Sequence, residues 1–377
     1  MKRTSSIFIT GGTGTVGGDV LRDFLTYTGE EVTVLVHTRG RDEDSIKFLT
    51  RLGLNSVMYS SRLRLIRGDI TLPKLGLDDT TYNSLSQRTT AILHSAASTR
   101  FDLSLEEARR INVNGTENVA QLALAAPRLE RFGFVSTAYV SGRRTGTILE
   151  TELLHNSGFV NSYEQSKYEA ENYLTTLSAQ LPIAVYRLST IIGDSRTGHV
   201  SHFTAPHQAL RIMYLGLASM IPGTTEYSID LIPSNVASHA IYKLFTEHFT
   251  PKKTYHIVAG KKHSYTLKEL IDASFAIFAE ISPEWATRNY PKPLIVDEVT
   301  FDLFLESAEM VDNVIIRNVL GAMKHFAHQL NYPKEFSSEE LVKVLPDFEK
   351  TLPHIREYYP KVIEYCFATN WGKHVSK

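Results

Sequence analysis

Tyr163 and Lys167 stand four residues apart in the segment Tyr-Glu-Gln-Ser-Lys, so a helix would place the phenol and the ammonium on one face. A free phenol has a pKa of about 10, which is too high for easy proton exchange at neutral pH. A neighbouring ammonium and an oxidised nicotinamide would both favour the phenolate and make Tyr163 a usable acid or base. Lys167 could also hold the ribose hydroxyls of such a cofactor. The pair alone is weak evidence, because this spacing is common on amphipathic helices.

A glycine-rich turn near the N-terminus strengthens the case for a nicotinamide cofactor. Residues 10–18 read Thr-Gly-Gly-Thr-Gly-Thr-Val-Gly-Gly and lie between an apolar run and an amphipathic segment. Gly11 would permit a sharp turn, Gly14 would let the backbone approach a pyrophosphate, and Gly17 would let the next helix pack closely on the sheet. That helix would present its N–H groups and positive dipole end to the phosphates. The other cofactor contacts predicted in this turn are Thr10, Thr15 and Val16.

The residues after the second expected strand bear on which dinucleotide is bound. An NAD site usually places an Asp or Glu about 20 residues beyond the glycines, where it binds the ribose 2′-hydroxyl. No acidic residue occurs from Val32 to Arg41, and Arg39 and Arg41 could neutralise a 2′-phosphate. The sequence therefore favours NADPH over NADH, with ordinary solvated loop charges as the alternative explanation of the two arginines.

Strand and helix signals alternate through the first half of the chain. This alternation predicts an α/β fold with a doubly wound, Rossmann-type parallel sheet. The expected strands are 6–10, 31–36, 63–67, 90–94, 131–136 and 182–188, with late strands at 229–232 and 255–259. The expected helices are 16–27, 105–126, 163–179, 210–217 and 235–245, and the chain after about residue 263 is mostly helical.

Several candidate ligand-binding residues stand where these strands end. In open parallel sheets, ligands bind beyond the carboxyl ends of the strands. Asp69 could hydrogen-bond an adenine amino group, although a loop acid or a helix cap explains it equally well. Thr137 offers a hydroxyl at the end of the strand 131–136. The strand-end residues expected at the cofactor are His37, Asp69, Ile70, Ala96 and Ala97.

Composition argues against several other classes of protein. The 377-residue chain has 40 Lys+Arg and 41 Asp+Glu, so its net charge of −1 gives no sign of a nucleic-acid-binding surface. One cysteine excludes an intrachain disulfide framework and a cysteine-based zinc cluster, and the 14 histidines show no His-Glu-x-x-His spacing, so no metal site is expected. No apolar run of about 18 residues predicts a membrane span, and no signal peptide is visible. We therefore expect a cytoplasmic protein.

The region around the strand 131–136 resembles a known superfamily. Residues 134–139 read Phe-Val-Ser-Thr-Ala-Tyr, and with the glycine turn and the Tyr163 motif they resemble the extended short-chain dehydrogenase/reductases. The resemblance implies a catalytic triad of Thr137, Tyr163 and Lys167, with Ser136 as the alternative hydroxyl. It also implies that a helix asparagine supports a proton-relay water. Asn112 matches that position, and Asn114 could be confused with it.

The resemblance narrows to one group within that superfamily. Residues 68–77, 94–97 and 192–198 are similar to segments of carrier-bound thioester reductases and the related fatty acyl-CoA reductases, the group with a male-sterility-like NAD-binding domain. These enzymes use NADPH to reduce acyl or peptidyl thioesters. This chain departs from the group's pattern in three ways. His37 stands where an Arg is usual, Leu188 replaces the frequent Pro after Arg187, and no adenylation or carrier domain is attached.

These observations predict a two-part molecule. Residues 1–190 and 228–260 would form an NADP-binding Rossmann domain, and residues 191–227 and 261–377 a smaller, mostly helical substrate lobe. The predicted reaction is NADPH-dependent reduction of a carbonyl, an acyl or peptidyl thioester on CoA or on a carrier protein met in trans, to an aldehyde or alcohol. The alternatives are a nucleotide-sugar epimerase or dehydratase, a ketone or aldehyde reductase, and a cofactor-sensing interaction protein on the same fold.

The expected substrate lobe carries no cofactor motif. Its apolar residues at helical spacing should mostly form a core, while some should line an acyl pocket together with the insertion from Gly198 to Pro222. We interpret the three histidines of that insertion as surface or packing residues. The apolar residues are Phe301, Phe304, Val311, Val314 and Ile315, and the histidines are His199, His202 and His207.

Overall fold

The computed structural model describes residues 6–37, 50, 52–54, 59, 61–309 and 327–372. Arg39 and Arg41, predicted to select the cofactor, lie outside the described residues. So do three of the apolar residues expected in the lobe, which are Val311, Val314 and Ile315.

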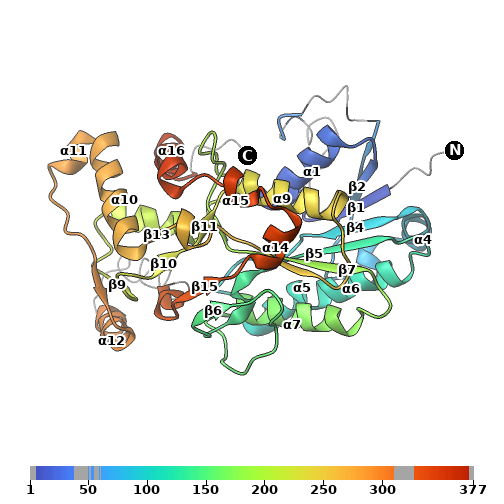
Figure 1. The fold of residues 1–377 in the computed structure, drawn as a ribbon, viewed down its shortest axis with the longest axis horizontal. Coiled ribbons are helices and arrows are strands. Elements are labelled where there is room, and N and C mark those ends of the chain that lie inside the picture. Colours follow the sequence, from blue (N-terminus) through green and yellow to red (C-terminus); the bar gives the residue numbers. More distant parts are fainter. Residues whose placement is uncertain are drawn as a thin grey trace.

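A seven-stranded parallel sheet forms the centre of the described structure, in the order β12-β7-β5-β4-β1-β2-β3 (Figure 1). The order reverses between β1 and β4, and ligands bind at such a switch point. This topology confirms the predicted Rossmann-type α/β fold. The strands are β1 (Ser6–Thr10), β2 (Glu31–Val36), β3 (Leu63–Arg67), β4 (Ala91–His94), β5 (Arg131–Thr137), β7 (Ile183–Leu188) and β12 (Thr254–Ile257).

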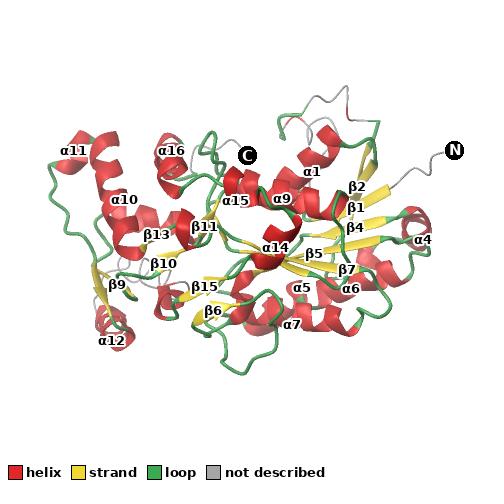
Figure 2. Ribbon diagram, in the orientation of Figure 1, coloured by secondary structure: helices red, strands yellow, loops and turns green. Residues whose placement is uncertain are grey.

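Helices cover both faces of this sheet, which explains why its strands are almost continuously apolar (Figure 2). Alternate residues of β1 divide between the two layers. Ile7 and Ile9 pack with Phe24 of α1 and Phe245 of α9, whereas Phe8 faces the opposite core. One layer holds α1 (Thr15–Tyr27) and α9 (Ser234–Thr246), and the other holds α4 (Asp79–Arg88), α5 (Leu105–Asn112), α6 (Asn114–Leu124) and α7 (Ser162–Thr176).

The single helix expected over residues 105–126 is wrong in one respect, because the chain breaks at Val113 into α5 and α6. Val113 has φ −90° and ψ −62°. The Thr116 hydroxyl donates to the Asn112 carbonyl at 2.6 Å, a side-chain bond to the preceding turn that commonly bends helices. The break leaves Asn112 buried at the end of α5.

A second lobe, at the left of Figure 1, has an aromatic-rich core of its own. Phe301 is fully buried in that core, as predicted, while Phe304 is partly buried against it. The lobe elements are α8 (Ala205–Tyr214), β9 (Met220–Pro222), β10 (Ser228–Ile229), β13 (Tyr265–Thr266), α10 (Leu267–Ile281), α11 (Pro283–Ala286), β14 (Leu294–Val296), α12 (Glu298–Glu309) and α16 (Ile355–Ala368). β8 (Thr190–Ile191) pairs with β11 (Leu231–Ile232) where the chain passes between the two parts. None of the described helices is long and apolar enough to cross a bilayer.

One C-terminal segment returns from the lobe to the large domain. β15 (Lys334–Phe336) pairs in parallel with β6 (Gly146–Ile148). Leu341 of α14 (Glu339–Val344) and Phe348 of α15 (Phe348–Thr351) then join the core of the central sheet. Packing thus assigns residues 334–352, expected in the lobe, to the Rossmann domain. The short 3-10 helices are η1 (Pro73–Gly76), η2 (Ala138–Ser141), η3 (Lys261–His263) and η4 (His328–Asn331).

Candidate active site

The glycine turn between β1 and α1 depends on glycine at two positions. Gly11 has φ +75°, and a Cβ there would lie 2.5 Å from the Ala96 backbone nitrogen. A Cβ on Gly17 would lie 2.2 Å from the Gly11 carbonyl oxygen. The Gly14 N–H closes the turn by donating to that oxygen at 2.9 Å. Larger residues at Gly11 or Gly17 would therefore force apart the sheet edge and the start of α1.

The N-terminus of α1 is suited to an anionic ligand. Its N-cap residue, Gly14, supplies no side-chain cap, and the first turn holds no acidic residue. The first N–H groups of α1 therefore have no carboxylate or hydroxyl cap competing for them. The turn opens into a cavity of about 850 Å³, and the predicted cofactor residues that line it here are Gly11, Gly14, Thr15, Val16 and Gly17. This arrangement fits a dinucleotide pyrophosphate.

Other predicted cofactor residues lie at neighbouring strand ends. Ala97 lines the cavity, but Ala96 beside it does not. Thr10 is fully buried, and its hydroxyl contacts His94 Nδ1 at 2.6 Å and accepts the Ala96 N–H at 3.3 Å. Thr10 therefore braces the ends of β1 and β4 rather than facing the cavity.

The ends of β2 and β3 meet beside the cavity and not in its lining. His37 Nδ1 lies 3.7 Å from a carboxylate oxygen of Asp69. Partial burial opposes ionisation of Asp69, but hydrogen bonds from Thr71 and the nearby His37 and Arg110 outweigh it and lower the pKa of the carboxyl. Ile70 is buried, and its carbonyl accepts from Asn118 at 2.8 Å. Contacts of His37, Asp69 and Ile70 with an adenosine group stay predictions.

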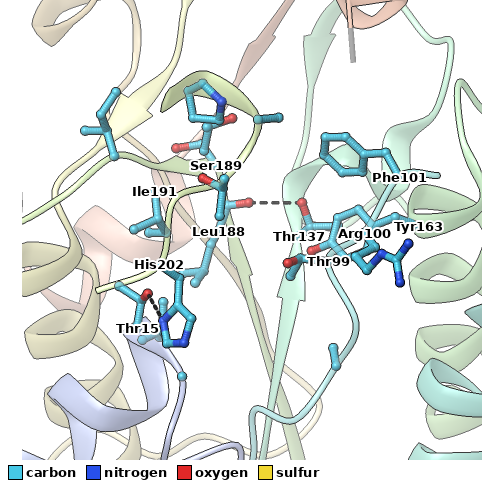
Figure 3. A pocket seen from close by; sticks show the side chains of 18 of the residues that line it. Thr15, Thr99, Arg100, Phe101, Thr137, Tyr163, Leu188, Ser189, Ile191 and His202 are labelled. Carbon is cyan, nitrogen blue, oxygen red and sulfur yellow. Dashed lines mark hydrogen bonds between the residues drawn. The ribbon is translucent and has the colours of Figure 1, made fainter. Parts of the chain in front are cut away.

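Thr137 and Tyr163 come together on one wall of the cavity (Figure 3). Thr137 ends β5, and its hydroxyl donates to the Leu188 carbonyl at 3.3 Å. Tyr163 lies in the first turn of α7, where Asn161 caps the helix by accepting the Glu164 N–H at 3.0 Å. The Thr137 side chain is also near enough to the Tyr163 phenol to lower the pKa of that phenol. The two hydroxyls thus meet at one point that a carbonyl oxygen could occupy.

Lys167 reaches the same cavity from the next turn of α7. Its ammonium donates to the Val135 carbonyl at 2.8 Å and lies 4.0 Å from the centre of the Phe134 ring. Burial lowers the pKa of Lys167 to about 7, although Glu171 opposes that shift. Lys167 is therefore poised between its charged and neutral forms near neutral pH.

The sequence predicts that Lys167 lowers the pKa of the Tyr163 phenol. In the structure that pKa is raised instead. Burial raises the pKa of Tyr163 to about 12, the hydrogen bond from Thr137 opposes the shift, and the negative charge of Glu164 adds to it. Burial has the largest effect on this pKa, and Phe101 packs beside the ring at 5.6 Å between ring centres. Tyr163 consequently holds its proton at neutral pH.

Ser136, the alternative to Thr137, is engaged elsewhere. Its hydroxyl donates to Glu171 at 2.9 Å, and Glu171 forms a fully buried ion pair with Arg187. Removing one partner of such a pair typically costs about 3–5 kcal/mol, because it leaves an uncompensated buried charge. Ser136 therefore belongs to a buried ionic network, whereas the Thr137 hydroxyl makes longer bonds of 3.3 Å to the Leu188 carbonyl and from the Tyr139 N–H, and its contact with a substrate stays a prediction.

Asn112 does not line the cavity. Its side-chain amide donates to the Ser98 carbonyl at 3.1 Å and to the Ser166 hydroxyl at 2.9 Å, and its carbonyl accepts the Ser98 N–H at 2.8 Å. Asn112 thus ties the loop after β4 to helix α7, while Asn114 is exposed. A proton-relay role for Asn112 stays a prediction.

The opposite wall of the cavity is predicted from the sequence only in part, as the contribution of the insertion from Gly198 to Pro222. It comprises residues 188–193 and 200–208 with Gln329, while the loop 99–102 closes the side next to Tyr163. The sequence does not indicate residues 188–191 or Gln329, which come from the end of β7, the short strand β8 and the short helix η4.

The three histidines of the insertion take different roles. His207 is buried and bonds the Ile192 carbonyl at 2.7 Å, whereas His199 is exposed and packs edge-on against Tyr365. His202 lines the cavity and lies 3.2 Å from the Thr15 hydroxyl (Figure 3). His207 and His199 have the packing and surface positions expected of them. His202 instead contacts Thr15 of the glycine turn across the cavity.

A smaller hollow of about 390 Å³ lies between α12 and η4. Glu298, Asp302 and His328 border it. The side-chain atoms with which they could bind a metal ion lie within 4.8 Å of one another. Tyr332 donates to Glu298 at 3.3 Å. The sequence spacing gave no hint of this group.

Comparison with known proteins places the chain in a family. The profile of an NAD-binding family described as male sterility protein matches residues 9–241, more than half of the chain. The chain belongs to this family. It is thus an NAD(P)-dependent oxidoreductase of the extended short-chain dehydrogenase/reductase type, which confirms the predicted superfamily and enzyme class.

Two relatives illustrate the range of proteins that carry this domain. A linear gramicidin synthase of Brevibacillus parabrevis is 29% identical over 68% of this chain, which covers 5% of that protein. Fatty acyl-CoA reductase wat of Drosophila melanogaster is 24% identical over 78% of this chain, which covers 65% of that protein. The chain therefore spans only part of either relative.

Solved structures agree with the fold. The terminal R domain from the myxalamid PKS-NRPS biosynthetic pathway superposes with a TM-score of 0.79 at 23% identity, covering 98% of this chain and 92% of that one. The reductase domain of a nonribosomal peptide synthetase from Mycobacterium tuberculosis gives 0.69 at 19% identity, covering 99% and 93%. UDP-glucuronic acid 4-epimerase from Bacillus cereus gives 0.65 at 17% identity, covering 99% and 100%.

Proposed function

We propose that this protein is an NADPH-dependent reductase of acyl or peptidyl thioesters. The observation that carries the proposal is the meeting of the Thr137 and Tyr163 hydroxyls on the cavity wall, in the same cavity as the glycine turn. Relatives named as a fatty acyl-CoA reductase and as a linear gramicidin synthase support a thioester as the substrate.

The two hydroxyls would hold the substrate carbonyl oxygen and stabilise the charge that develops on it. A bound nicotinamide dinucleotide supplies the hydride that reduces the carbonyl carbon. Tyr163 donates its proton to the developing alkoxide, and its raised pKa means that the proton is present at neutral pH. Lys167 in its charged form would stabilise the phenolate that remains.

A thioester reduced in this way becomes a hemithioacetal, which collapses to a free thiol and an aldehyde. A second hydride and a second proton from Tyr163 would carry the aldehyde to the alcohol. The thiol would be CoA or the pantetheine arm of a carrier protein met in trans.

The preference for NADPH rests on the sequence between β2 and the next described residues. No acidic residue occurs from Val32 to Arg41 to bind a ribose 2′-hydroxyl, and Arg39 and Arg41 supply two positive charges. Arginine binds phosphate through charge-assisted hydrogen bonds.

The direct test is NADPH oxidation against acyl-CoA esters, N-acetylcysteamine thioesters, aldehydes and UDP-sugars. We expect thioester-dependent oxidation with stoichiometric release of thiol. Turnover of a UDP-sugar without net NADPH oxidation would instead identify an epimerase. Oxidation with aldehydes or ketones and not with thioesters would identify a simple carbonyl reductase.

A further inference from the structure

Gln329 is the cavity-lining residue contributed by the C-terminal third of the described chain. It lies in η4, between α12 and β15, and its side-chain amide donates to Glu164 at 2.6 Å. Glu164 directly follows Tyr163 on α7, so this bond fastens the lobe segment to the turn that carries the candidate acid.

Glu164 fixes which way the Gln329 amide is oriented. The carboxylate is fully buried, and its second oxygen accepts the Val160 N–H at 3.0 Å. Burial raises the pKa of Glu164, while these hydrogen bonds and the positive charges of Lys334 and Arg143 oppose the rise and favour the ionised form. Both oxygens of the ionised carboxylate act only as acceptors. In the structure Gln329 Nε2 donates to Glu164 Oε1 at 2.6 Å, which leaves the Gln329 carbonyl oxygen as the atom available to a ligand.

Gln329 lines the same cavity as the apolar residues Ile191, Val200 and Phe203, so an acceptor on its side chain would meet a ligand bound there. An acceptor in such a place favours a ligand that brings a donor, because a ligand without one leaves the acceptor desolvated and unpaired. Thioester substrates carry donors of this kind as amide N–H groups, in the pantetheine arm or in a peptidyl acyl chain.

We propose that the Gln329 side-chain carbonyl accepts a hydrogen bond from a substrate amide N–H, and that Glu164 acts as the positioning residue that orients it. This inference rests on the proposed thioester reductase function. It makes Gln329 a specificity-determining residue that favours amide-bearing thioesters over simple ones.

The test compares Gln329→Met, which keeps the length and loses the acceptor, with Gln165→Met as the matched control. Gln165 is also a glutamine that donates to a glutamate, Glu169 at 3.1 Å, but it does not line the cavity. Three substrates with an eight-carbon chain distinguish recognition of the amide from recognition of the rest of the substrate. They are the octanoyl N-acetylcysteamine thioester, the octanoyl butanethiol thioester, which has no amide, and octanal. An N-acetylaminoacyl butanethiol thioester places the amide on the acyl side instead.

We expect Gln329→Met to raise KM roughly two- to tenfold for the amide-bearing substrate, as for one neutral hydrogen bond, with kcat little changed. The amide-free substrates and the Gln165→Met variant should show no such rise. Which of the two amide-bearing thioesters responds identifies whether the arm or the acyl chain is recognised. An equal KM effect on all substrates, or none on any, would overturn the proposal.

Binding supplies a readout independent of turnover. Calorimetry with the S-octyl thioether of N-acetylcysteamine, which cannot be reduced, should show the same two- to tenfold weakening in Gln329→Met. If no thioester is reduced, the proposed function fails. Thioether binding still tests whether the Gln329 carbonyl accepts a hydrogen bond from the ligand amide. Equal thioether affinity in the wild type and Gln329→Met would reject the role of Gln329 even in an active thioester reductase.

Discussion

The two walls of the cavity are built in different ways. Thr137, Tyr163 and Lys167 stand on β5 and α7, and buried bonds to Leu188, Asn161 and Val135 hold the elements that carry them. The opposite wall consists of the segments 188–193 and 200–208, in which loops alternate with the short strand β8 and the start of α8, joined by Gln329 from η4. Rigid elements keep reacting groups in place, whereas loops can vary to suit a ligand. The contrast suggests that one wall performs the chemistry and the other selects the substrate.

The largest effect should follow a change on the wall that carries Thr137, Tyr163 and Lys167, the first wall. Tyr163→Phe keeps the ring packed against Phe101 and removes the transferable proton. We expect turnover to fall roughly a hundredfold or more, the usual contribution of acid–base catalysis, while the Kd for NADPH stays close to that of the wild type. Steady-state kinetics and fluorescence titration measure the two quantities. Near-normal turnover would remove Tyr163 from the mechanism.

Cofactor choice should respond to a change outside both walls. Arg39→Ala should weaken NADPH by about 1.5–3 kcal/mol, as for the loss of a charge-assisted phosphate contact, and hardly change NADH. Titration of both cofactors against the wild type and the variant measures this difference. Equal affinity of the wild type for NADPH and NADH would contradict the proposed preference.

The charge of Lys167 predicts a pH dependence on the first wall. Burial lowers the pKa of Lys167 to about 7, so the ammonium is charged below that pH and neutral above it. If reduction needs the charged form, kcat/KM should fall as pH rises above about 7, approaching tenfold per unit. The free enzyme's kcat/KM profile measures this pKa.

Lys167→Arg provides the control, because a guanidinium stays charged throughout the accessible range. The variant should be slower than the wild type at pH 6 but keep a flat profile to pH 9. A wild-type profile that is equally flat would show that the charge state of Lys167 does not limit the reaction.

The smallest effect should come from a substitution on the second wall, which residues 188–193, 200–208 and Gln329 form. Ala205, at the start of α8, is a small residue lining the cavity. Ala205→Leu should shift the preference toward shorter acyl chains by a factor of a few, since each methylene of pocket depth is worth about 0.8 kcal/mol. The affinity for NADPH should not change. An unaltered ratio of kcat/KM between short and long acyl substrates would argue against the lobe as the selector.

The same contrast explains what could be predicted from the sequence. The glycine turn and the Tyr163–Lys167 pair depend on local spacing, so a strand, a turn and a helix suffice to place them. The contact between Glu164 and Gln329 joins residues 165 positions apart, and no local pattern records it. The return of residues 334–352 to the central sheet depends on the β15–β6 pairing, which has the same non-local origin.

The pKa shifts and hydrogen-bond partners of the buried side chains also could not be predicted from local spacing. Helical spacing indicates that Tyr163 and Lys167 share a face, but not that burial shifts the pKa of Tyr163 up and that of Lys167 down. Similarly, Ser136 and Thr137 are neighbours of like chemistry in the sequence. Only the structure shows that Ser136 bonds the buried Glu171–Arg187 pair while Thr137 bonds backbone groups at the cavity wall.

The most direct test of thioester reduction is isotope transfer in a single turnover. Enzyme loaded with NADPH that carries deuterium at the transferable C4 position is mixed with octanoyl-N-acetylcysteamine. The products are then analysed by mass spectrometry alongside a thiol assay. The proposed function predicts one deuterium on C1 of the aldehyde and one equivalent of free thiol from the wild type, and almost none of either from Tyr163→Phe. Thiol release without deuterium in the product, or equal transfer by both proteins, would contradict it.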